Sequence, residues 1–226
     1  MADYIQLHPE SPQQNRIFEL ADEIRKSGVV LLPTDSRYAL ACDYQNKKGI
    51  DRIRQIRGNK KKLHLTVLCE SLEHVSTFAR MDDRNFKLIK RLIPGPYTFI
   101  LPATREVPRL LVHDKKKTVG IRVPDYPICL DLVRVTGNPL LAISAKLPDE
   151  NEFENNISNN ALFLESFENQ VDVIVDNGED YYKDDETTIL DMTGDSLIVL
   201  RAALGMDKLR EVTMSQGYEL EMDEFL

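Results

Sequence analysis

The sequence predicts a single α/β domain whose twisted, mixed parallel and antiparallel sheet is flanked by helices. Short apolar runs alternate with segments of helical spacing, as in proteins that pack helices on a sheet. Several apolar runs follow one another without a helix between them, which favours a mixed sheet over a purely parallel one. The chain of 226 residues is long enough for one core, since domains usually hold about 50 to 250 residues. We expect this domain at residues 1–203, followed by an acidic extension at 204–226.

The first half of the chain contains the clearest helical periodicity. Ile17, Leu20, Ala21 and Ile24 recur at helical spacing, which predicts a helix over residues 16–27 with Gly28 as its C-terminal cap. The run VVLLP follows as a buried strand. Helical spacing returns at Ile50, Ile53 and Ile56, before the β-rich segment LHLTVL.

Further elements are predicted along the rest of the chain. A helix is expected near residues 86–93, with Asp82 and Asp83 as candidate caps, and after a Pro-Gly-Pro break the runs YTFIL and TVGIRV are typical of strands. A helix from Pro127 to Val135 should end at Gly137, followed by the apolar run LLAIS. The segment from 148 to 160 indicates a surface loop, and DVIVD, TTILDM and SLIVLR supply the last strands. The acidic C-terminal YELEMDEFL is expected to be poorly ordered or docked through its last two residues, Phe225 and Leu226.

Charge is distributed unevenly along the chain. Residues 1–146 contain 25 Lys and Arg against 16 Asp and Glu, a net charge of +9, whereas residues 147–226 contain 4 against 21, a net charge of −17. The overall charge of −8 therefore does not exclude an anionic ligand. The cations gather at residues 47–62, 84–91 and 115–117, and three clusters in one segment favour a shared positive face over three separate solvated surfaces.

The signatures of several protein classes are missing. No apolar run approaches the roughly 20 residues that span a bilayer, and the N-terminus lacks the features of a secretion signal, so we expect a cytoplasmic protein with no membrane partner. Cys42, Cys69 and Cys129 lie in apolar runs and are interpreted as buried thiols outside disulfides. Glycine-rich phosphate loops, a G-x-S-x-G elbow and zinc-binding spacings of Cys and His are also absent. We therefore predict no metal site, and a nucleotide would have to be held by side chains.

A hydroxyl-rich turn follows the first buried strand. In VVLLPTDSRYALACD, the side chains of Thr34, Asp35, Ser36 and Tyr38 come at the carboxyl end of the strand, where open α/β sheets bind their ligands. An ordinary Pro-Thr-Asp turn would have the same composition. Taken alone, this segment leaves a binding turn and a plain connecting turn equally open.

Six segments in the same order and at similar spacing resemble the YrdC/YciO family. They are PTDSRYALACD, IRQIRGNKKKLHLTVLC, PGPYTFIL, TVGIRVPDYP, LLAISAK and TTILDMTGDSLIVLR, and the resemblance as a whole covers roughly residues 10–203. The resemblance implies a twisted α/β sheet around a basic concave cavity that binds ATP and double-stranded RNA. Catalytic members are similar to threonylcarbamoyl-adenylate synthases. These nucleotidyltransferases join L-threonine, bicarbonate and ATP, release pyrophosphate, and supply a group for tRNA modification.

The resemblance also implies roles for individual residues. The threonine side would consist of Ser36, Arg122, Ser144 and Thr187, and the ATP side of Arg57, Lys61, Thr118, Lys146 and Arg201, with Arg57 and Ser144 as the catalytic pair. ATP would be substrate or ligand, accompanied by Mg²⁺, and no permanent cofactor is implied. An arginine can bind a carboxylate through two parallel hydrogen bonds, and cations can offset phosphate charge as pyrophosphate leaves. Without the resemblance, pairing of Arg122 with Asp125 and a purely structural Thr187 would be the simpler interpretations.

The chain departs from the catalytic pattern at two motifs. Catalytic members carry Lys-x-Arg after the basic helix and Ser-x-Asn after the later strand, where this chain has Arg57-Gly58-Asn59 and Ser144-Ala145-Lys146. An arginine presents a planar fork where lysine presents a compact ammonium. Asn59 stands where the first motif has its arginine, and Lys146 stands where the second motif has its asparagine, so a cation and an amide have exchanged positions. Independent drift at the two positions would give the same pattern. These differences resemble the YciO branch more than the synthase branch, so the sequence leaves enzyme activity undecided.

Two functions remain open at this stage. The first is nucleotide binding, with synthase activity either retained or lost. The second is non-catalytic binding of double-stranded RNA in tRNA or rRNA processing, in which Lys60, Lys61 and Lys62 contact phosphates. A protein that binds duplex RNA recognises shape and backbone and needs few aromatic residues, and this chain has no Trp. No oligomeric state is indicated.

Overall fold

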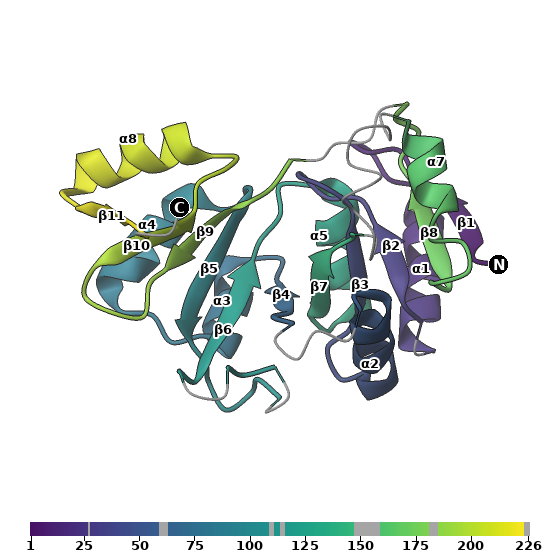
Figure 1. Cartoon of the computed structure of the whole chain (residues 1–226), viewed down its shortest axis with the longest axis horizontal. Helices are drawn as coiled ribbons and strands as arrows, with labels where there is room; N and C mark the ends of the chain where they lie inside the picture. The colour runs from purple at the N-terminus through teal and green to yellow at the C-terminus, as the bar shows by residue number, and fades with distance from the viewer. Residues whose placement is uncertain are drawn as a thin grey trace. The chain divides into compact units, whose positions relative to one another are not determined.

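The structure is a computed structural model that describes residues 1–26, 28–58, 63–108, 111–113, 116–146, 159–180 and 185–223. Its elements group into two compact units, each made of two stretches of the chain (Figure 1). The first unit comprises Met1–Leu63 and Tyr126–Asp184, and the second comprises His64–Asp125 and Asp185–Leu226. Each unit packs helices on a mixed sheet, so the predicted α/β class is confirmed. Among the residues described, no helix has the length and apolar content to cross a membrane.

The first unit is built on five strands. Their order is β1 (Asp3–Gln6), β8 (Val173–Asp176), β2 (Val30–Leu32), β3 (Ala39–Asp43) and β7 (Leu140–Ser144). Strand β8 is parallel to both β1 and β2, and β3 is antiparallel to both β2 and β7. Strands β1, β8, β2 and β7 therefore run in one direction, and their carboxyl ends share one edge of the sheet.

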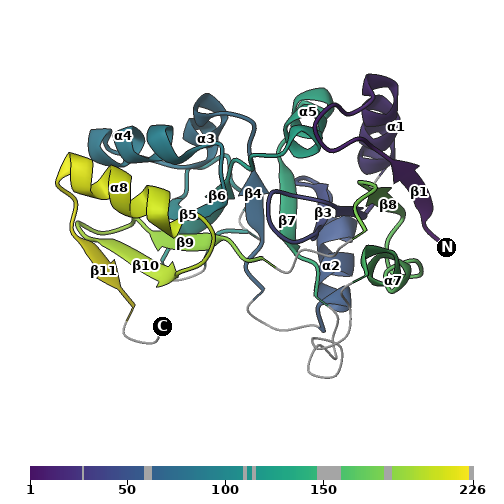
Figure 2. The same ribbon diagram turned by 90° about the horizontal axis from the view of Figure 1, so that it is seen from above.

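Helices cover both faces of this sheet. In Figure 2, α1 (Gln14–Arg25) and α5 (Pro127–Thr136) lie on one face, and α2 (Lys47–Ile56) and α7 (Asn160–Glu165) lie on the other. Helix α1 buries the four residues that predicted it and packs against α5. Helix α5 ends at Gly137 with φ of 71°, as predicted, because glycine adopts the left-handed conformation without a steric penalty.

The end of α1 differs from the prediction. The C-cap is Lys26, and Gly28 lies two positions beyond it. The Gly28 N–H donates to the Glu23 carbonyl at 3.2 Å, which is the closing hydrogen bond of a Schellman-type helix end. The sequence therefore predicted correctly that the helix ends near Gly28, but Gly28 is not the cap residue.

The second unit is built on six strands. Their order is β4 (Thr66–Leu68), β6 (Thr118–Arg122), β5 (Tyr97–Pro102), β9 (Thr188–Asp191), β10 (Leu197–Arg201) and β11 (Leu220–Met222). The pairs β4–β6, β5–β9 and β10–β11 are parallel, whereas β5–β6 and β9–β10 are antiparallel. As a result, the carboxyl ends of β4, β6 and β10 lie at the same end of the sheet as the beginnings of β5 and β9.

Helices cover one face of this second sheet. Helices α3 (Leu72–Phe78) and α4 (Asp83–Leu92) lie on that face, and α8 (Met206–Gln216) packs against α4 (Figure 2). Within the described part of this unit, the other face carries no helix. Asp82 caps α4 by accepting from the Asn85 N–H, as predicted.

The C-terminal segment is more regular than the sequence suggested. Residues 206–222 form α8 and β11, and β11 pairs with β10. Phe225 and Leu226, through which docking was expected, lie outside the described residues. The proposed division into a 1–203 domain and a 204–226 extension stays a prediction, as does the basic concave cavity.

Gly205 provides a test of the second core. It precedes α8 with φ of 87°, and a Cβ there would lie 2.7 Å from the ring of Tyr97, whose hydroxyl donates to the Gly205 carbonyl. Gly205→Ala should lower the free energy of unfolding by about 2–4 kcal/mol, because overpacking adds to a left-handed backbone. Gly217→Ala is the matched control: its φ is 69° but its surroundings are open, so it should lose only about 1 kcal/mol. Urea unfolding measures both, and equal losses would contradict the packing argument.

Candidate functional site

Polar residues follow the parallel strands of the first unit at their shared carboxyl edge. Ser36 follows β2, Asn177 follows β8, and Ser144 ends β7. The register pairs Ser144 with Ala39, the first residue of β3, so the turn that carries Ser36 lies beside Ser144. Ligands of open α/β sheets bind at such an edge. The structure therefore brings together two residues predicted for the threonine side.

The turn between β2 and β3 is held by its own hydroxyl groups. The Thr34 Oγ1 accepts from the Ser36 N–H at 3.1 Å and donates to the Arg37 carbonyl at 2.8 Å, and it lies 3.1 Å from the Ser36 Oγ. Because Thr34 uses its only hydroxyl hydrogen on Arg37, Ser36 is the donor between the two hydroxyls.

A buried amide anchors this turn. The Tyr38 hydroxyl donates to Asn177 Oδ1 at 3.0 Å, and Asn177 Nδ2 donates to the Tyr126 hydroxyl at 3.1 Å. The Asn160 amide also donates to Asn177 Oδ1, at 3.4 Å. Burial raises the pKa of Tyr126 to about 12 and raises the pKa of Tyr38 above its usual value. Both phenols therefore stay protonated at neutral pH, and the network keeps its hydrogens.

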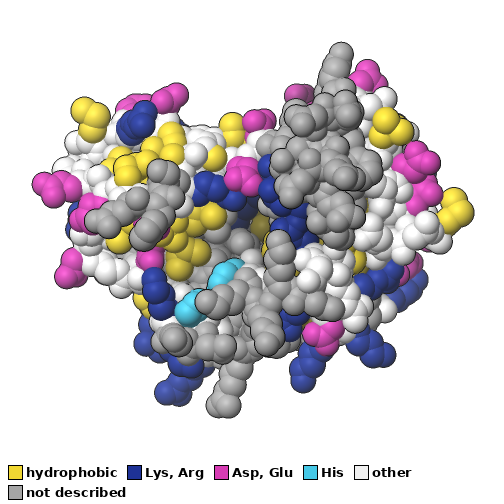
Figure 3. Space-filling model, viewed as in Figure 1, with side chains coloured by type: hydrophobic (Ala, Val, Ile, Leu, Met, Phe, Trp, Pro, Cys, Tyr) yellow, Lys and Arg dark blue, Asp and Glu magenta, His cyan; other side chains and the backbone are white. Residues whose placement is uncertain are grey.

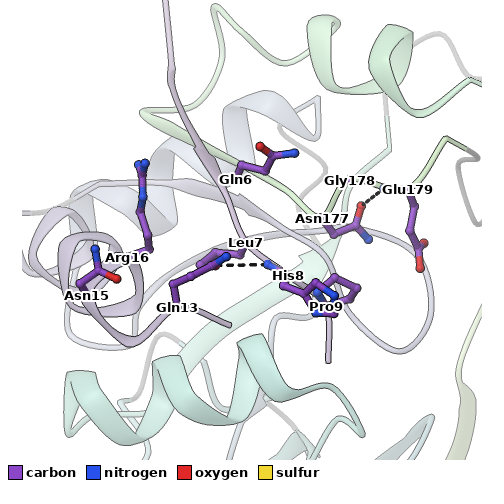
Figure 4. A pocket seen from close by; sticks show the side chains of 10 residues that line it. All are labelled: Gln6, Leu7, His8, Pro9, Gln13, Asn15, Arg16, Asn177, Gly178 and Glu179. Carbon is purple, nitrogen blue, oxygen red and sulfur yellow. Dashed lines mark hydrogen bonds between the residues drawn. The ribbon is translucent and has the colours of Figure 1, made fainter. Parts of the chain in front are cut away.

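A cavity of about 620 Å³ opens at the same edge of the first unit (Figure 4). It is lined by residues 6–9, residues 177–179 and the start of α1 at Gln13, Asn15 and Arg16. Asn177 belongs both to this lining and to the buried network, so the cavity borders the anchor of the turn. None of the predicted site residues that the structure describes lines it, and its polar lining includes the amides of Gln6, Gln13, Asn15 and Asn177.

The two altered motifs of the first unit lie next to each other. Arg57 is the C-cap of α2, and its guanidinium donates to the Lys146 carbonyl at 3.3 Å. Ser144 precedes Lys146 by two residues. The predicted residues Ser36, Arg57, Ser144 and Lys146 thus all belong to the first unit, and Lys61 lies outside the described residues together with Asn59, Lys60 and Lys62.

A second group of predicted residues gathers at one end of the second sheet. The pairing of Ile121 with Phe99 places Arg122 opposite Thr98, whose hydroxyl lies 3.2 Å from that of Thr187. Arg201 donates to both the Thr187 hydroxyl and the Thr187 carbonyl, each at 2.8 Å. The structure therefore brings Arg122, Thr187 and Arg201 to one end of the sheet.

Arg201 is also balanced by an acid. Its guanidinium lies 3.1 Å from the Glu186 carboxylate. Together with the two bonds to Thr187, this ion pair fixes the orientation of the guanidinium and offsets part of its charge. The side chain is suited to a directional contact with a ligand more than to long-range attraction.

Thr118 lies at the other end of β6 from Arg122. The two residues face the same side of the sheet, since they are four positions apart, and are separated by about 13 Å along the strand. Between them, Gly120 offers no side chain: a Cβ there would lie 3.5 Å from Thr66 Oγ1 and 3.7 Å from Thr98 Cγ2. Thr118, Gly120 and Arg122 therefore form a strip, with no side chain at its middle position, on the face without helices.

Sequence reasoning overlooked Thr98, Gly120 and Asn177. The alternation in TVGIRV and YTFIL carried a signal for the first two, because period two places Thr118, Gly120 and Arg122 on one face. Asn177 directly follows the apolar run DVIVD, just as the Thr34 turn follows VVLLP. The rule that ligands bind at the carboxyl ends of strands pointed to the turn after VVLLP, and it applied equally to the residue after DVIVD.

The cysteines and acidic residues offer no competing centre. All three cysteines are buried and none forms a disulfide, which confirms that expectation. Burial raises the pKa of Cys42 to about 12, so its thiol is unreactive at neutral pH. Across the described ranges, no three His, Cys, Asp or Glu side chains lie close enough together to hold a metal ion.

These features define an α/β protein that presents hydroxyl groups and cations at the ends of its strands. A family model described as telomere recombination, covering Sua5, YciO and YrdC proteins, matches residues 22–203. The chain belongs to this Sua5/YciO/YrdC family.

Individual relatives place the chain more finely. It is 40% identical over 205 residues to a protein of Haemophilus influenzae and 38% identical over the same length to YciO of Escherichia coli, covering 91% of this chain and 97% of each relative. The crystal structure of E. coli YciO matches with a TM-score of 0.82 and 37% identity, over 92% of this chain and 99% of that one. Threonylcarbamoyl-AMP synthase of Pyrococcus abyssi is 27% identical over 191 residues, 84% of this chain and 54% of that protein. The chain is thus a YciO-like member of the family.

The network around Asn177 is testable. Asn177→Ala would leave the buried hydroxyls of Tyr38 and Tyr126 without this partner, so the free energy of unfolding should fall by about 2–4 kcal/mol. Tyr4→Phe is the comparison, because its exposed hydroxyl bonds to Glu168 at the surface and its loss should cost less than about 1 kcal/mol. Chemical denaturation measures both variants. If the Asn177 variant were as stable as the Tyr4 variant, the amide would not anchor the turn.

Proposed function

We propose that the protein binds ATP together with a small amino acid of the threonine type. The observation that carries the proposal is the strip on β6, where Thr118 and Arg122 flank the bare backbone of Gly120. A glycine inside a strand often marks a place where a ligand approaches the backbone closely. The strip measures about 13 Å, so an extended ligand such as a nucleotide, and not a lone ion, suits it.

Each unit, taken by itself, supplies side chains that suit part of such a ligand. In the second unit, Arg122 is of the type that binds an amino-acid carboxylate through two parallel bonds, and Arg201 is a cation of the type that binds phosphates. In the first unit, Ser36 is a hydroxyl of the type that binds an ammonium, and Arg57 and Lys146 are further cations. The names of two relatives support a ligand of this kind. The P. abyssi protein carries the name threonylcarbamoyl-AMP synthase, and P. abyssi Sua5, solved as a complex with L-threonine, shares the fold with a TM-score of 0.80 at 23% identity.

Turnover would depend on electrostatic stabilisation by these cations. No covalent step by the protein is required, since the cations need only offset the charge that develops as pyrophosphate leaves. A displacement of about 1 Å in such groups can lower a rate about a hundredfold while binding persists. With Arg57 in place of a lysine and Lys146 in place of an asparagine, we infer that ATP binding is retained and that synthase turnover is slow or lost.

Gly120→Val tests the nucleotide site. Valine suits a strand and a Cβ fits there in ordinary contact, so the fold should persist while the side chain fills the strip, and ATP affinity measured by calorimetry should fall at least about tenfold. The control is Gly194→Val, at a position with nothing within 4 Å. Unchanged ATP affinity in Gly120→Val would exclude the strip as the nucleotide-binding site.

Incubation of the wild-type chain with ATP, L-threonine and bicarbonate separates turnover from binding, since only a synthase releases pyrophosphate in a threonine-dependent way.

Double-stranded RNA binding is the second candidate. The observation that favours it is the net charge of +9 on residues 1–146. Part of the basic helix is used within the fold, because Arg52 pairs with Asp172 at 2.6 Å and Arg54 with Asp51 at 3.5 Å. Lys47 and Lys48 on α2 are exposed, and Lys60, Lys61 and Lys62 follow in the sequence.

RNA binding of this kind should depend steeply on salt. The logarithm of the affinity should fall linearly with the logarithm of salt concentration, with a slope of about −0.9 per neutralised phosphate, the coefficient of B-DNA. Replacing Lys60, Lys61 and Lys62 by Ala should flatten this slope, whereas replacing the exposed Lys208 on α8, which lies outside the three cation clusters, serves as the control. Fluorescence anisotropy with an RNA duplex measures it. Affinity independent of salt, or no binding at low salt, would rule this function out.

A further inference from the structure

A second cavity, of about 700 Å³, lies within the second unit. Arg80, Arg105 and Lys117 line it, and Val107 and Val112 contribute an apolar part of its wall. Figure 3 shows Lys and Arg side chains gathered around the lower end of this unit, below β5 and β6. The three cations come from the end of α3 and from the connection between β5 and β6, so the sequence separates them while the fold brings them together.

Backbone hydrogen bonds hold the segments that carry these cations. The Arg80 N–H donates to the Pro102 carbonyl at 2.8 Å, and the Ala103 N–H donates to the Lys117 carbonyl at 3.0 Å. Ala79 and Ala103 form an antiparallel bridge. The end of α3, the end of β5 and the start of β6 are thereby tied side by side, which makes the cavity a feature of the fold and not of mobile side chains alone.

Lys117 has an unusual backbone conformation. Its φ is 55°, in the left-handed region that disfavours residues with a side chain. The conformation is held from both sides, since the Lys117 N–H donates to the His113 carbonyl and its own carbonyl accepts from Ala103. Such positions persist only where the surroundings fix them, and they cluster at functional sites. A glycine would adopt this backbone more easily, so the lysine side chain is retained at a cost.

The described residues that line the cavity carry charge of one sign. None of these residues is acidic, and within the described ranges Arg80, Arg105 and Lys117 form no ion pair. The adjacent Lys116 differs, because its ammonium lies 3.5 Å from the Asp191 carboxylate. Three cations that converge on one concave surface raise the local potential for an anion.

We propose that this cavity binds the phosphate group of a phosphate ester. The cations would contact the phosphate oxygens, and the apolar wall of Val107 and Val112 would contact the organic part. Its volume lies in the range of small-molecule sites, about 300–1,000 Å³. Lys117 directly precedes Thr118, so the cavity adjoins that end of the strip on β6 and lies away from its Arg122 end, which is about 16 Å from Lys117. The ester is either a free small molecule or the backbone of an RNA.

Lys117→Gly removes one cation without harming the fold, because glycine suits the left-handed backbone. With inorganic pyrophosphate as the probe, calorimetry of the full chain at low salt should give an affinity about tenfold weaker for this variant. Its thermal midpoint should be unchanged or higher. The matched control is Lys116→Gln, which removes the neighbouring charge outside the cavity and should keep the affinity within about twofold.

A second measurement locates the contact. Pyrophosphate should slow the acetylation of Lys117 in the wild-type chain, as read by mass spectrometry, and should leave Lys116 unaffected. The same protection in Gly120→Val would show that the cavity binds independently of the proposed nucleotide site. Two results together would overturn the proposal. Lys117 would be acetylated equally with and without pyrophosphate, and Lys117→Gly would match the wild type in its affinity for pyrophosphate and for an RNA duplex.

An RNA duplex of about 16 base pairs distinguishes the two sources of phosphate. If the ester belongs to RNA, Lys117→Gly should weaken duplex binding and reduce the salt slope by about 0.9. If the ester is a free small molecule, the variant should lose pyrophosphate binding and keep duplex binding unchanged. Absence of binding to either probe by the wild-type chain at low salt would also overturn the proposal.

Discussion

The buried amide of Asn177 holds together the part of the first unit on which the candidate site depends. Its partners come from the turn before β3, the start of α5 and the start of α7, at Tyr38, Tyr126 and Asn160. An apolar side chain could fill this volume but could not fix the direction of two phenols. Buried polar groups must be satisfied, at about 1–3 kcal/mol for each one left unsatisfied, so these segments have one favoured arrangement. The position of Ser36 is therefore set by a residue far away in the sequence.

The second unit uses its arginines in two contrasting ways. Two hydrogen bonds to Thr187 fix the orientation of the Arg201 guanidinium, and the Glu186 carboxylate offsets part of its charge. Arg201 can therefore orient a ligand but attracts anions only weakly. Arg80 and Arg105 are exposed and line a cavity whose described lining holds no acidic residue, so they can attract an anion but do little to orient it. The first arrangement suits the discrimination of a ligand by shape, and the second suits the capture of any phosphate. Under the two proposals, one sheet would serve two kinds of anion recognition at its two ends.

The sequence predicted the elements whose signal is local. Helix α1 followed from the spacing of its apolar residues, and α5 from a proline at its start and Gly137 at its end. The four-residue strand β1 was missed because its pairing with β8 joins segments about 170 residues apart, and so few residues carry no period. Similarly, the resemblance indicated Ser36 and Ser144 individually, but their adjacency depends on the β3–β7 register. The role of Asn177 rests on distant partners, which no local pattern specifies.

The placement of β8 between β1 and β2 governs how the chain can assemble during its synthesis. Both neighbours are made early, whereas residues 173–176 come after the whole first stretch of the second unit. Until that late strand leaves the ribosome, one edge of β1 and one edge of β2 expose backbone groups that await a partner. Exposed strand edges are templates for association with other chains. The edges of β1 and β2 that pair with β8 therefore stay unpaired for most of the synthesis of the chain.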